Sequence, residues 1–234
     1  MAMLEVKDLN VYYGMIQAIK GISFEVNQGE VIALIGANGA GKTTTLHAVT
    51  GLTPVKSGHI FFEGKDITKV PAHKIVSMGM AHVPEGRRVF AQLSVYQNLK
   101  MGAYTRKDKD EIRQTLDMVY EHFPRLEERK NQMAGTLSGG EQQMLTVARG
   151  LMQNPTMILL DEITEGLAPI VVDQLAEIVS QLRKMNVSIL VAEQSVKFAL
   201  AVSDDCYILE KGNVVLHKPT AELTHEEILK YLGT

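Results

Sequence analysis

The feature that most constrains the fold of this chain is a glycine-rich segment directly after a short apolar run. The segment is Gly36-Ala-Asn-Gly-Ala-Gly-Lys-Thr43, and the run is Val31–Ile35. Glycines let the backbone turn tightly and direct successive N–H groups inward, and a helix that starts at the end of the turn adds its positive terminus. Strand, glycine-rich loop and helix together form the context of a phosphate-binding loop (P-loop). The segment therefore predicts a P-loop in an α/β fold.

The residues of this loop have separate expected roles. Lys42 supplies a positive charge for the β- and γ-phosphates of ATP. The Thr43 hydroxyl is placed to bind Mg²⁺, which neutralises charge on the same phosphates. The backbone of residues 38–44 is expected to surround the phosphates. The nucleotide-binding residues predicted here are Gly36, Asn38, Gly39, Ala40, Gly41, Lys42, Thr43 and Thr44.

A second acidic element lies far downstream, where the apolar run Met157–Leu160 is followed by Asp161 and Glu162. A strand that ends in an acidic turn is common, so this element alone predicts little. Beside a P-loop it has the form of a Walker B element. Asp161 is then expected to hold Mg²⁺ directly or through water, and Glu162 to orient the water that attacks the γ-phosphate.

Hydrophobic patterning predicts two kinds of sheet. Val31–Ile35, Met157–Leu160 and Ser188–Ala192 are continuous apolar runs, which suit strands covered on both faces in a parallel α/β sheet. Apolar and polar residues instead alternate over Leu4–Lys7 and Ile22–Val26, a period of two that is typical of half-buried strands. The chain is therefore expected to begin as a separate sheet.

Helical periodicity marks much of the remaining chain. Apolar residues recur every three or four positions within Asp108–Phe123 and again within Val171–Leu182. The region from about 92 to 154 contains no clear buried-strand run. We interpret this region as a mostly helical insertion between two strands of the α/β core.

Composition excludes several classes of protein. Of the 234 residues, 45% are hydrophobic and 22% are charged, which is typical of a globular protein. A net charge of −3 lacks the basic excess of a general nucleic-acid binder, so no nucleic-acid partner is expected. The single cysteine fits a reducing compartment, and no apolar run approaches the length of about 20 residues that spans a bilayer. We expect a cytoplasmic protein whose membrane role, if any, depends on a partner.

The segment Leu137-Ser-Gly-Gly-Glu141 resembles the signature motif of ATP-binding cassette (ABC) proteins. Ser138 offers a hydroxyl, Gly139 and Gly140 offer open backbone N–H groups, and a helix starting here presents its positive end. A simple capping box formed by Ser138 and Glu141 is a second interpretation, compatible with the first. The resemblance implies that Ser138, Gly139, Gly140 and Glu141 face the γ-phosphate held by a second subunit, so that two chains enclose two ATP molecules.

The resemblance extends over essentially all of the chain and assigns further residues. Tyr13 falls where the family stacks an aromatic ring on adenine. Glu85 replaces the glutamine that usually contacts Mg²⁺, and Gln194 replaces the switch histidine that contacts the γ-phosphate. A carboxylate still ligates Mg²⁺ and an amide N–H still reaches a phosphate oxygen, so both roles are retained in altered form.

The resemblance implies the following fold class: an α/β P-loop NTPase of the ABC ATPase type. Its mixed central sheet carries an N-terminal antiparallel β subdomain and a helical subdomain. The whole chain, 1–234, is expected to be one ABC ATP-binding domain, with the helical subdomain at about 86–155.

Two segments narrow the resemblance, Val83–Phe90 and Glu165–Pro169, which are similar to the LivF-type ATPase subunits of branched-chain amino acid importers. This implies an ATPase that drives membrane permease subunits on the inner face of the cell membrane, together with a second ATPase subunit and, indirectly, a solute-binding protein. Leucine, isoleucine or valine is the expected cargo. Urea or another amide, lipopolysaccharide export, a non-transport ABC ATPase and an ATP-dependent switch with little turnover stay open as alternatives.

Overall fold

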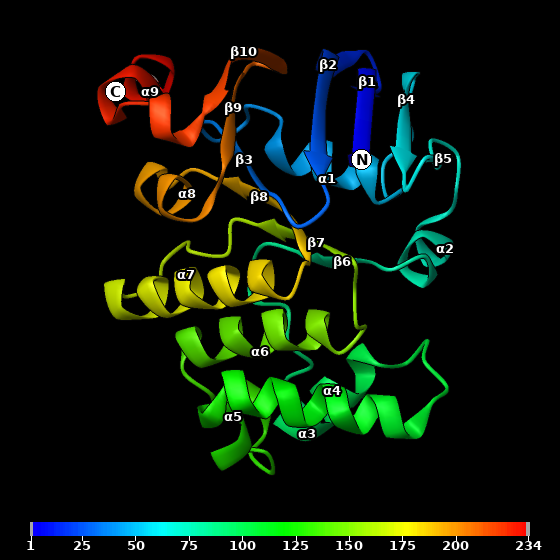
Figure 1. The fold of residues 1–234 in the computed structure, drawn as a ribbon, viewed down its shortest axis with the longest axis vertical. Coiled ribbons are helices and arrows are strands. Elements are labelled where there is room, and N and C mark those ends of the chain that lie inside the picture. The colour runs from blue at the N-terminus through cyan, green and yellow to red at the C-terminus, as the bar shows by residue number, and fades with distance from the viewer. Residues whose placement is uncertain (1, 233–234) are drawn as a thin grey trace.

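The computed structural model describes residues 2–232 of the chain (Figure 1). The first part of the chain contributes a four-stranded antiparallel sheet with the order β2-β1-β4-β5. Its strands are β1 (Ala2–Tyr13), β2 (Ile16–Asn27), β4 (Ser57–Phe62) and β5 (Lys65–Asp66). Apolar side chains such as Leu4 and Val6 are buried on one face, as their alternation with polar residues predicts. The antiparallel N-terminal subdomain expected from the sequence is confirmed.

A six-stranded sheet forms the centre of the molecule, with the order β10-β9-β3-β8-β7-β6. Five strands of this sheet, β3, β6, β7, β8 and β9, run parallel to one another, and β10 pairs antiparallel with β9. The sheet is therefore mixed, as expected. The strands are β3 (Val31–Ile35), β6 (Met80–Val83), β7 (Met157–Asp161), β8 (Ser188–Glu193), β9 (Asp205–Glu210) and β10 (Asn213–Pro219).

Both faces of the central sheet are covered, which explains the continuous apolar runs. In β3, Ile32 and Leu34 join a buried cluster with α1 (Lys42–Val49) and the N-terminal sheet. Ala33 and Ile35 point to the opposite face, into a cluster with α8 (Val196–Val202). A strand packed on both faces has no position where a polar side chain reaches water, so every residue of the run is apolar.

The segment between β6 and β7 is largely helical and lies at the end of the molecule opposite the N-terminal sheet (Figure 1). Its helices are α3 (Val95–Gly102), α4 (Lys109–His122), α5 (Pro124–Glu128) and α6 (Gly139–Leu151), with a 3₁₀ turn at Ala134–Thr136. The Asp108 side chain caps α4 by accepting hydrogen bonds from the N–H groups of Asp110 and Glu111. Val119 and Phe123 of its apolar stripe are buried in the core.

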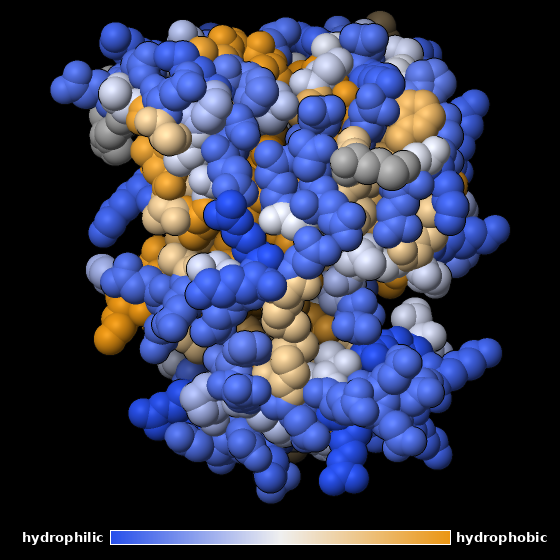
Figure 2. Space-filling view, viewed as in Figure 1, coloured by the Kyte–Doolittle hydropathy of each residue, from blue (hydrophilic) through white to orange (hydrophobic). Residues whose placement is uncertain are grey.

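The remaining helices complete the layers around the sheet. They are α2 (Ala72–Ser77), α7 (Pro169–Lys184) and α9 (His225–Leu232), with a second 3₁₀ turn at Thr220–Glu222. Hydrophilic side chains cover most of the face shown in Figure 2. No helix within residues 2–232 combines the length and the apolar character that a membrane span requires.

Candidate functional site

The parallel strands of the central sheet bring three distant segments to one edge. In the strand register, Ile35 at the end of β3 pairs with Glu193 at the end of β8, and Asp161 of β7 pairs with Ala192. Loops that follow the carboxyl ends of parallel strands meet at the same edge of the sheet, where α/β proteins bind their ligands. The glycine-rich loop, the acidic pair and the segment around Gln194 therefore surround one site.

Close packing and backbone geometry explain the glycines of the loop. A Cβ atom on Gly36 would lie 2.6 Å from the Leu209 carbonyl oxygen and 2.7 Å from Ala40 Cβ, so only glycine fits. Gly41 has a φ of 111°, a conformation that residues with a side chain rarely adopt. The turn at Gly41 starts α1 at Lys42, which directs the first N–H groups of the helix toward the loop.

Lys42 is almost completely buried and lies at the centre of the site. Its ammonium nitrogen donates hydrogen bonds to the carbonyl oxygens of Gly36 at 2.7 Å and Ala37 at 3.1 Å. The same nitrogen lies 3.0 Å from Glu162 Oε1. The loop therefore holds a positive charge directly beside the carboxylate of Glu162.

Thr43 and Asp161 are joined by a hydrogen bond of 3.1 Å from the threonine hydroxyl to Asp161 Oδ1. Asp161 is fully buried, and its second oxygen, Oδ2, has no hydrogen-bond partner among the described residues. Burial raises the pKa of Asp161 to about 6, and the nearby carboxylates of Glu162 and Glu85 act in the same direction. A buried acceptor without a partner, beside a hydroxyl and further carboxylates, is a donor set that fits a hard divalent cation such as Mg²⁺.

Glu162 has a φ of 45°, in the left-handed region that non-glycine residues seldom occupy. Its backbone N–H donates a hydrogen bond of 2.9 Å to the Ala192 carbonyl. One carboxylate oxygen each of Glu162, Glu85 and Glu165 lies within 4.8 Å of the others. The exposed Glu85 therefore lies close to Glu162.

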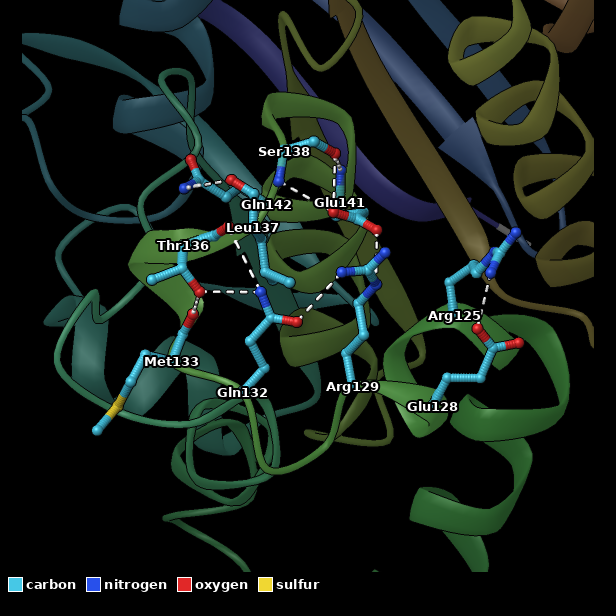
Figure 3. Close-up of polar contacts among 10 residues, drawn as sticks. All are labelled: Arg125, Glu128, Arg129, Gln132, Met133, Thr136, Leu137, Ser138, Glu141 and Gln142. Atoms are coloured by element: carbon cyan, nitrogen blue, oxygen red, sulfur yellow. Dashed lines mark hydrogen bonds and ion pairs between the residues drawn. The ribbon is translucent and has the colours of Figure 1, made fainter.

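A hydrogen-bonded network organises the start of α6 (Figure 3). The Ser138 hydroxyl caps the helix by accepting from Glu141 N–H, while Glu141 Oε2 accepts from both the N–H and the hydroxyl of Ser138 at 2.9 Å. Arg129 Nε lies 2.9 Å from Glu141 Oε1, and an Arg129 Nη1–H group donates to the Gln132 side chain. The capping-box interpretation of this motif is correct, and Ser138 and the N-terminus of α6 remain at the surface.

A cleft of about 380 Å³ opens over the glycine-rich loop. Its lining includes Lys42 and Glu162 together with two further cations, Lys20 and Lys211. Ile16, Gln17, Ala18, Gly39, Gly41, Thr43 and Thr44 complete it. Tyr13 lies outside this lining: its ring is half exposed, and its hydroxyl is 3.4 Å from the Thr53 hydroxyl.

Comparison with known proteins identifies the family. The ABC transporter family matches residues 19–165, more than half of the chain. This chain belongs to the ABC transporter family. The high-affinity branched-chain amino acid transport ATP-binding protein BraG of Pseudomonas aeruginosa is 47% identical over 233 residues, covering 99% of this chain and all of BraG.

More distant relatives of this ABC protein also cover it almost completely. A probable branched-chain amino acid transport ATP-binding protein LivF of Archaeoglobus fulgidus is 36% identical over 96% of this chain and 95% of its own. The lipopolysaccharide export system ATP-binding protein LptB of Escherichia coli is 35% identical over 100% and 98%. The ADP conformation of MJ1267, an ATP-binding cassette of an ABC transporter, superposes with a TM-score of 0.86 at 26% identity and covers 98% of this chain and 94% of that one. The expected ABC ATPase fold is confirmed.

The sequence analysis did not predict that three further residues of the ABC protein contact the segments of the site. Glu193 is buried at the end of β8, Arg87 donates hydrogen bonds to the carbonyls of Glu165 and Gly166, and Arg129 pairs with Glu141. The Arg87 guanidinium also occupies the space beside Gly139 that a Cβ atom would fill. Of the three, only Glu193 is marked in the sequence, because it lies one position before Gln194.

Histidines of the ABC protein show no metal-ligand spacing in the sequence, yet the fold brings two of them to the site. His47 of α1 and His82 of β6 lie edge to face, with ring centroids 5.8 Å apart. One ring nitrogen of His47, one ring nitrogen of His82 and one carboxylate oxygen of Asp161 all lie within 4.8 Å of one another. Burial lowers the pKa of His82 to about 4, with His47 acting in the same direction, so His82 is neutral at physiological pH.

Proposed function

We propose that this ABC protein binds and hydrolyses ATP to drive a membrane importer for branched-chain amino acids. The observation that carries the proposal is the assembly of Lys42, Thr43, Asp161 and Glu162 at one edge of the sheet, with a buried lysine 3.0 Å from a carboxylate. A cation for phosphate oxygens, a hydroxyl and a carboxylate for a metal, and a second carboxylate for water are the groups that phosphoryl transfer to water needs.

Each group has a proposed role. Lys42 and the backbone of residues 38–44 bind the phosphates, Glu162 orients the attacking water, and Gln194 donates to the γ-phosphate. Gln194 is exposed directly after β8, where its amide is free to reach a ligand. Tyr13 is the proposed adenine contact, with its ring half exposed at the end of β1. Thr43, Glu85 and Asp161 are the proposed Mg²⁺ ligands, and the bound cation supplies positive charge to the β- and γ-phosphates.

The exposed N-terminus of α6 supports a dimeric mechanism. Ser138 is exposed and Gly139, Gly140 and Glu141 are partly exposed, so the helix terminus lies near the surface, where it is suited to bind a phosphate from another molecule. We propose that this surface completes the ATP site of a second ABC ATPase subunit, in a head-to-tail pair. Two ATP molecules then lie between the two subunits.

The relatives support the proposed cargo and location. The most similar of the three relatives reported above is named as a branched-chain amino acid transport ATP-binding protein and shares 47% identity over the full length. The lipopolysaccharide export relative is less similar, at 35%. We therefore propose uptake of leucine, isoleucine or valine through separate permease subunits fed by a solute-binding protein. The ATPase would sit on the cytoplasmic face of the membrane.

ATP hydrolysis by the purified wild type and by Glu162→Gln tests the proposal. Loss of a water-positioning carboxylate should lower kcat by about 100-fold or more. Size-exclusion chromatography in Mg-ATP should then show a dimer of the variant, because ATP persists between the subunits. Glu177→Gln is the matched control, since this exposed carboxylate of α7 lies outside the site. An inactive wild type, or equal kcat for wild type and Glu162→Gln, would contradict the catalytic assignment.

Reconstitution with the permease subunits tests the cargo. ATP hydrolysis by the assembled transporter should rise when its binding protein is loaded with leucine, isoleucine or valine. Urea and lipopolysaccharide are the comparison substrates. Stimulation by either of these in place of the amino acids would replace the proposed cargo while leaving the ATPase assignment intact.

A further inference from the structure

Glu193 is a buried carboxylate with no role in the function proposed above. Its residue is only 2% exposed, at the last position of β8. Removing a carboxylate from water is costly unless hydrogen bonds compensate for the lost solvation. The environment of Glu193 raises its pKa to about 7, chiefly through burial. Such a carboxylate is kept in the interior by the groups that it contacts.

The carboxylate of Glu193 holds Thr164 through both of its oxygens. Oε1 accepts a hydrogen bond of 3.1 Å from the Thr164 backbone N–H. Oε2 accepts a hydrogen bond of 2.9 Å from the Thr164 hydroxyl. Both hydrogen bonds join the turn after β7 to the last residue of β8.

The turn that contains Thr164 also carries the group assigned to the attacking water, because Thr164 follows Glu162 by two residues. The two bonds from Glu193 therefore fix the backbone that follows Glu162. The Glu162 N–H is itself bonded to the Ala192 carbonyl at 2.9 Å. The end of β8 therefore holds the backbone on both sides of Glu162.

The strained backbone of Glu162 makes such support necessary. A non-glycine residue at a φ of 45° is maintained only when its surroundings impose that conformation. The Ala192 carbonyl and the Glu193 carboxylate are the two groups of β8 that bond to residues 162 and 164. Without Glu193, the turn would keep its anchor at residue 162 and lose both bonds at residue 164.

We propose that Glu193 is a positioning residue for ATP hydrolysis, which bonds Thr164 and so holds Glu162 in its working geometry. The proposal rests on the function proposed above, because it assumes that Glu162 orients water. Glu193 itself contacts neither nucleotide nor water in this role. Its loss should lower the rate of the chemical step and leave nucleotide binding by the glycine-rich loop unchanged.

Three variants test the proposal. Glu193→Gln keeps the shape and replaces one acceptor oxygen by a donor, and Thr164→Val keeps the shape and removes the hydroxyl donor. Thr164→Ser retains the hydroxyl and serves as the conservative rescue. Thr115→Val, which removes a buried hydroxyl within the helical insertion, is the control for a general loss of stability. The readouts are kcat, KM for ATP, and the thermal midpoint of unfolding.

For Glu193→Gln and Thr164→Val we expect kcat to fall about tenfold, the effect of a lost hydrogen bond to a charged group, with KM changed less than about twofold. Thr164→Ser and Thr115→Val should keep kcat within about twofold of wild type. A wild-type kcat in Thr164→Val would overturn the proposal. This test does not depend on whether Glu193→Gln folds. So would an equal loss of kcat in Thr164→Ser. An inactive wild type would instead overturn the proposed ATPase function.

Discussion

Lys42 at the start of α1 and Glu162 in the turn after β7 form a largely buried ion pair, with 3.0 Å between the lysine nitrogen and Glu162 Oε1. The phosphates of ATP must compete with this carboxylate for the same ammonium group. Removing the charge of Glu162 should therefore strengthen ATP binding while it abolishes hydrolysis. The two functions assigned to this pair can be separated by one substitution.

We expect Glu162→Gln to bind ATP about fivefold more tightly than wild type, corresponding to about 1 kcal/mol. Calorimetric titration with a non-hydrolysable ATP analogue in the presence of Mg²⁺ measures the affinity without interference from turnover. Glu177→Gln controls for the change in net charge and should bind like wild type. Weaker binding by Glu162→Gln would show that the carboxylate contributes to ATP affinity, contrary to this expectation.

Arg87 connects the segment after β6 to the loop that follows Glu162. Its Nη2 donates to the Glu165 carbonyl at 3.1 Å and to the Gly166 carbonyl at 2.9 Å. Arg87→Ala should lower kcat about fivefold, or about 1 kcal/mol, because the loop loses two hydrogen bonds that lie in an exposed, solvent-screened position. Arg113→Ala removes an exposed arginine from α4 and should have no effect. Equal kcat values for Arg87→Ala and Arg113→Ala would contradict the expectation that Arg87 supports the loop after Glu162.

The Arg129–Glu141 pair should affect activity more than stability. Arg129 is 39% exposed and Glu141 18%, so solvent screens the pair and its loss should cost less than about 1 kcal/mol of unfolding free energy. Glu141 in turn binds Ser138, which is proposed to complete the ATP site of the second subunit. Arg129→Ala should therefore still lower the rate of ATP hydrolysis by the dimer. Arg125→Ala is the matched control, since Arg125 pairs with Glu128 on the neighbouring turn and not with Glu141 (Figure 3). A large loss of stability with unchanged activity would refute this expectation.

The buried Glu193 should make the stability of the fold depend on pH. Its pKa is raised by burial from 4.5 to about 7, so the folded chain binds the proton more tightly than the unfolded chain. This contribution to stability is complete below pH 4.5 and is lost as the pH rises to about 7. Urea unfolding at pH 5 and pH 7.5 should therefore show a smaller decrease in stability for Glu193→Gln than for wild type. An identical decrease would mean that Glu193 is not protonated in the folded state at pH 5.

The sequence predicted the elements whose signals are local. The glycine-rich loop, the acidic strand end and the start of α6 each combine an unusual motif with an apolar strand or a helix start. The continuous apolar runs also predicted a sheet covered on both faces, which the buried clusters around Ile32 and Ala33 confirm. These predictions succeeded because hydrogen bonding and hydrophobic periodicity act over a few residues.

Contacts between distant segments could not be predicted in the same way. Arg87 is an arginine in a polar stretch, and its spacing gives no sign of bonds to residues 165 and 166. His47 and His82 come from a helix and a strand far apart in the sequence, so their spacing gives no sign that the fold brings them together. Glu193 looks like any acidic residue at a strand end until the fold shows that it is buried.

The sequence by itself predicted the family, a sheet covered on both faces, a separate N-terminal sheet, and the glycine-rich loop and acidic strand end with their candidate residues. Only the tertiary structure decided the partners of those residues: Lys42 with Glu162, Thr43 with Asp161, and Glu193 with Thr164. The physical reason is that a motif specifies local backbone geometry, whereas an ion pair or a buried hydrogen bond depends on which strand ends the parallel sheet places side by side. The register of β3, β7 and β8 determines which strand ends lie side by side.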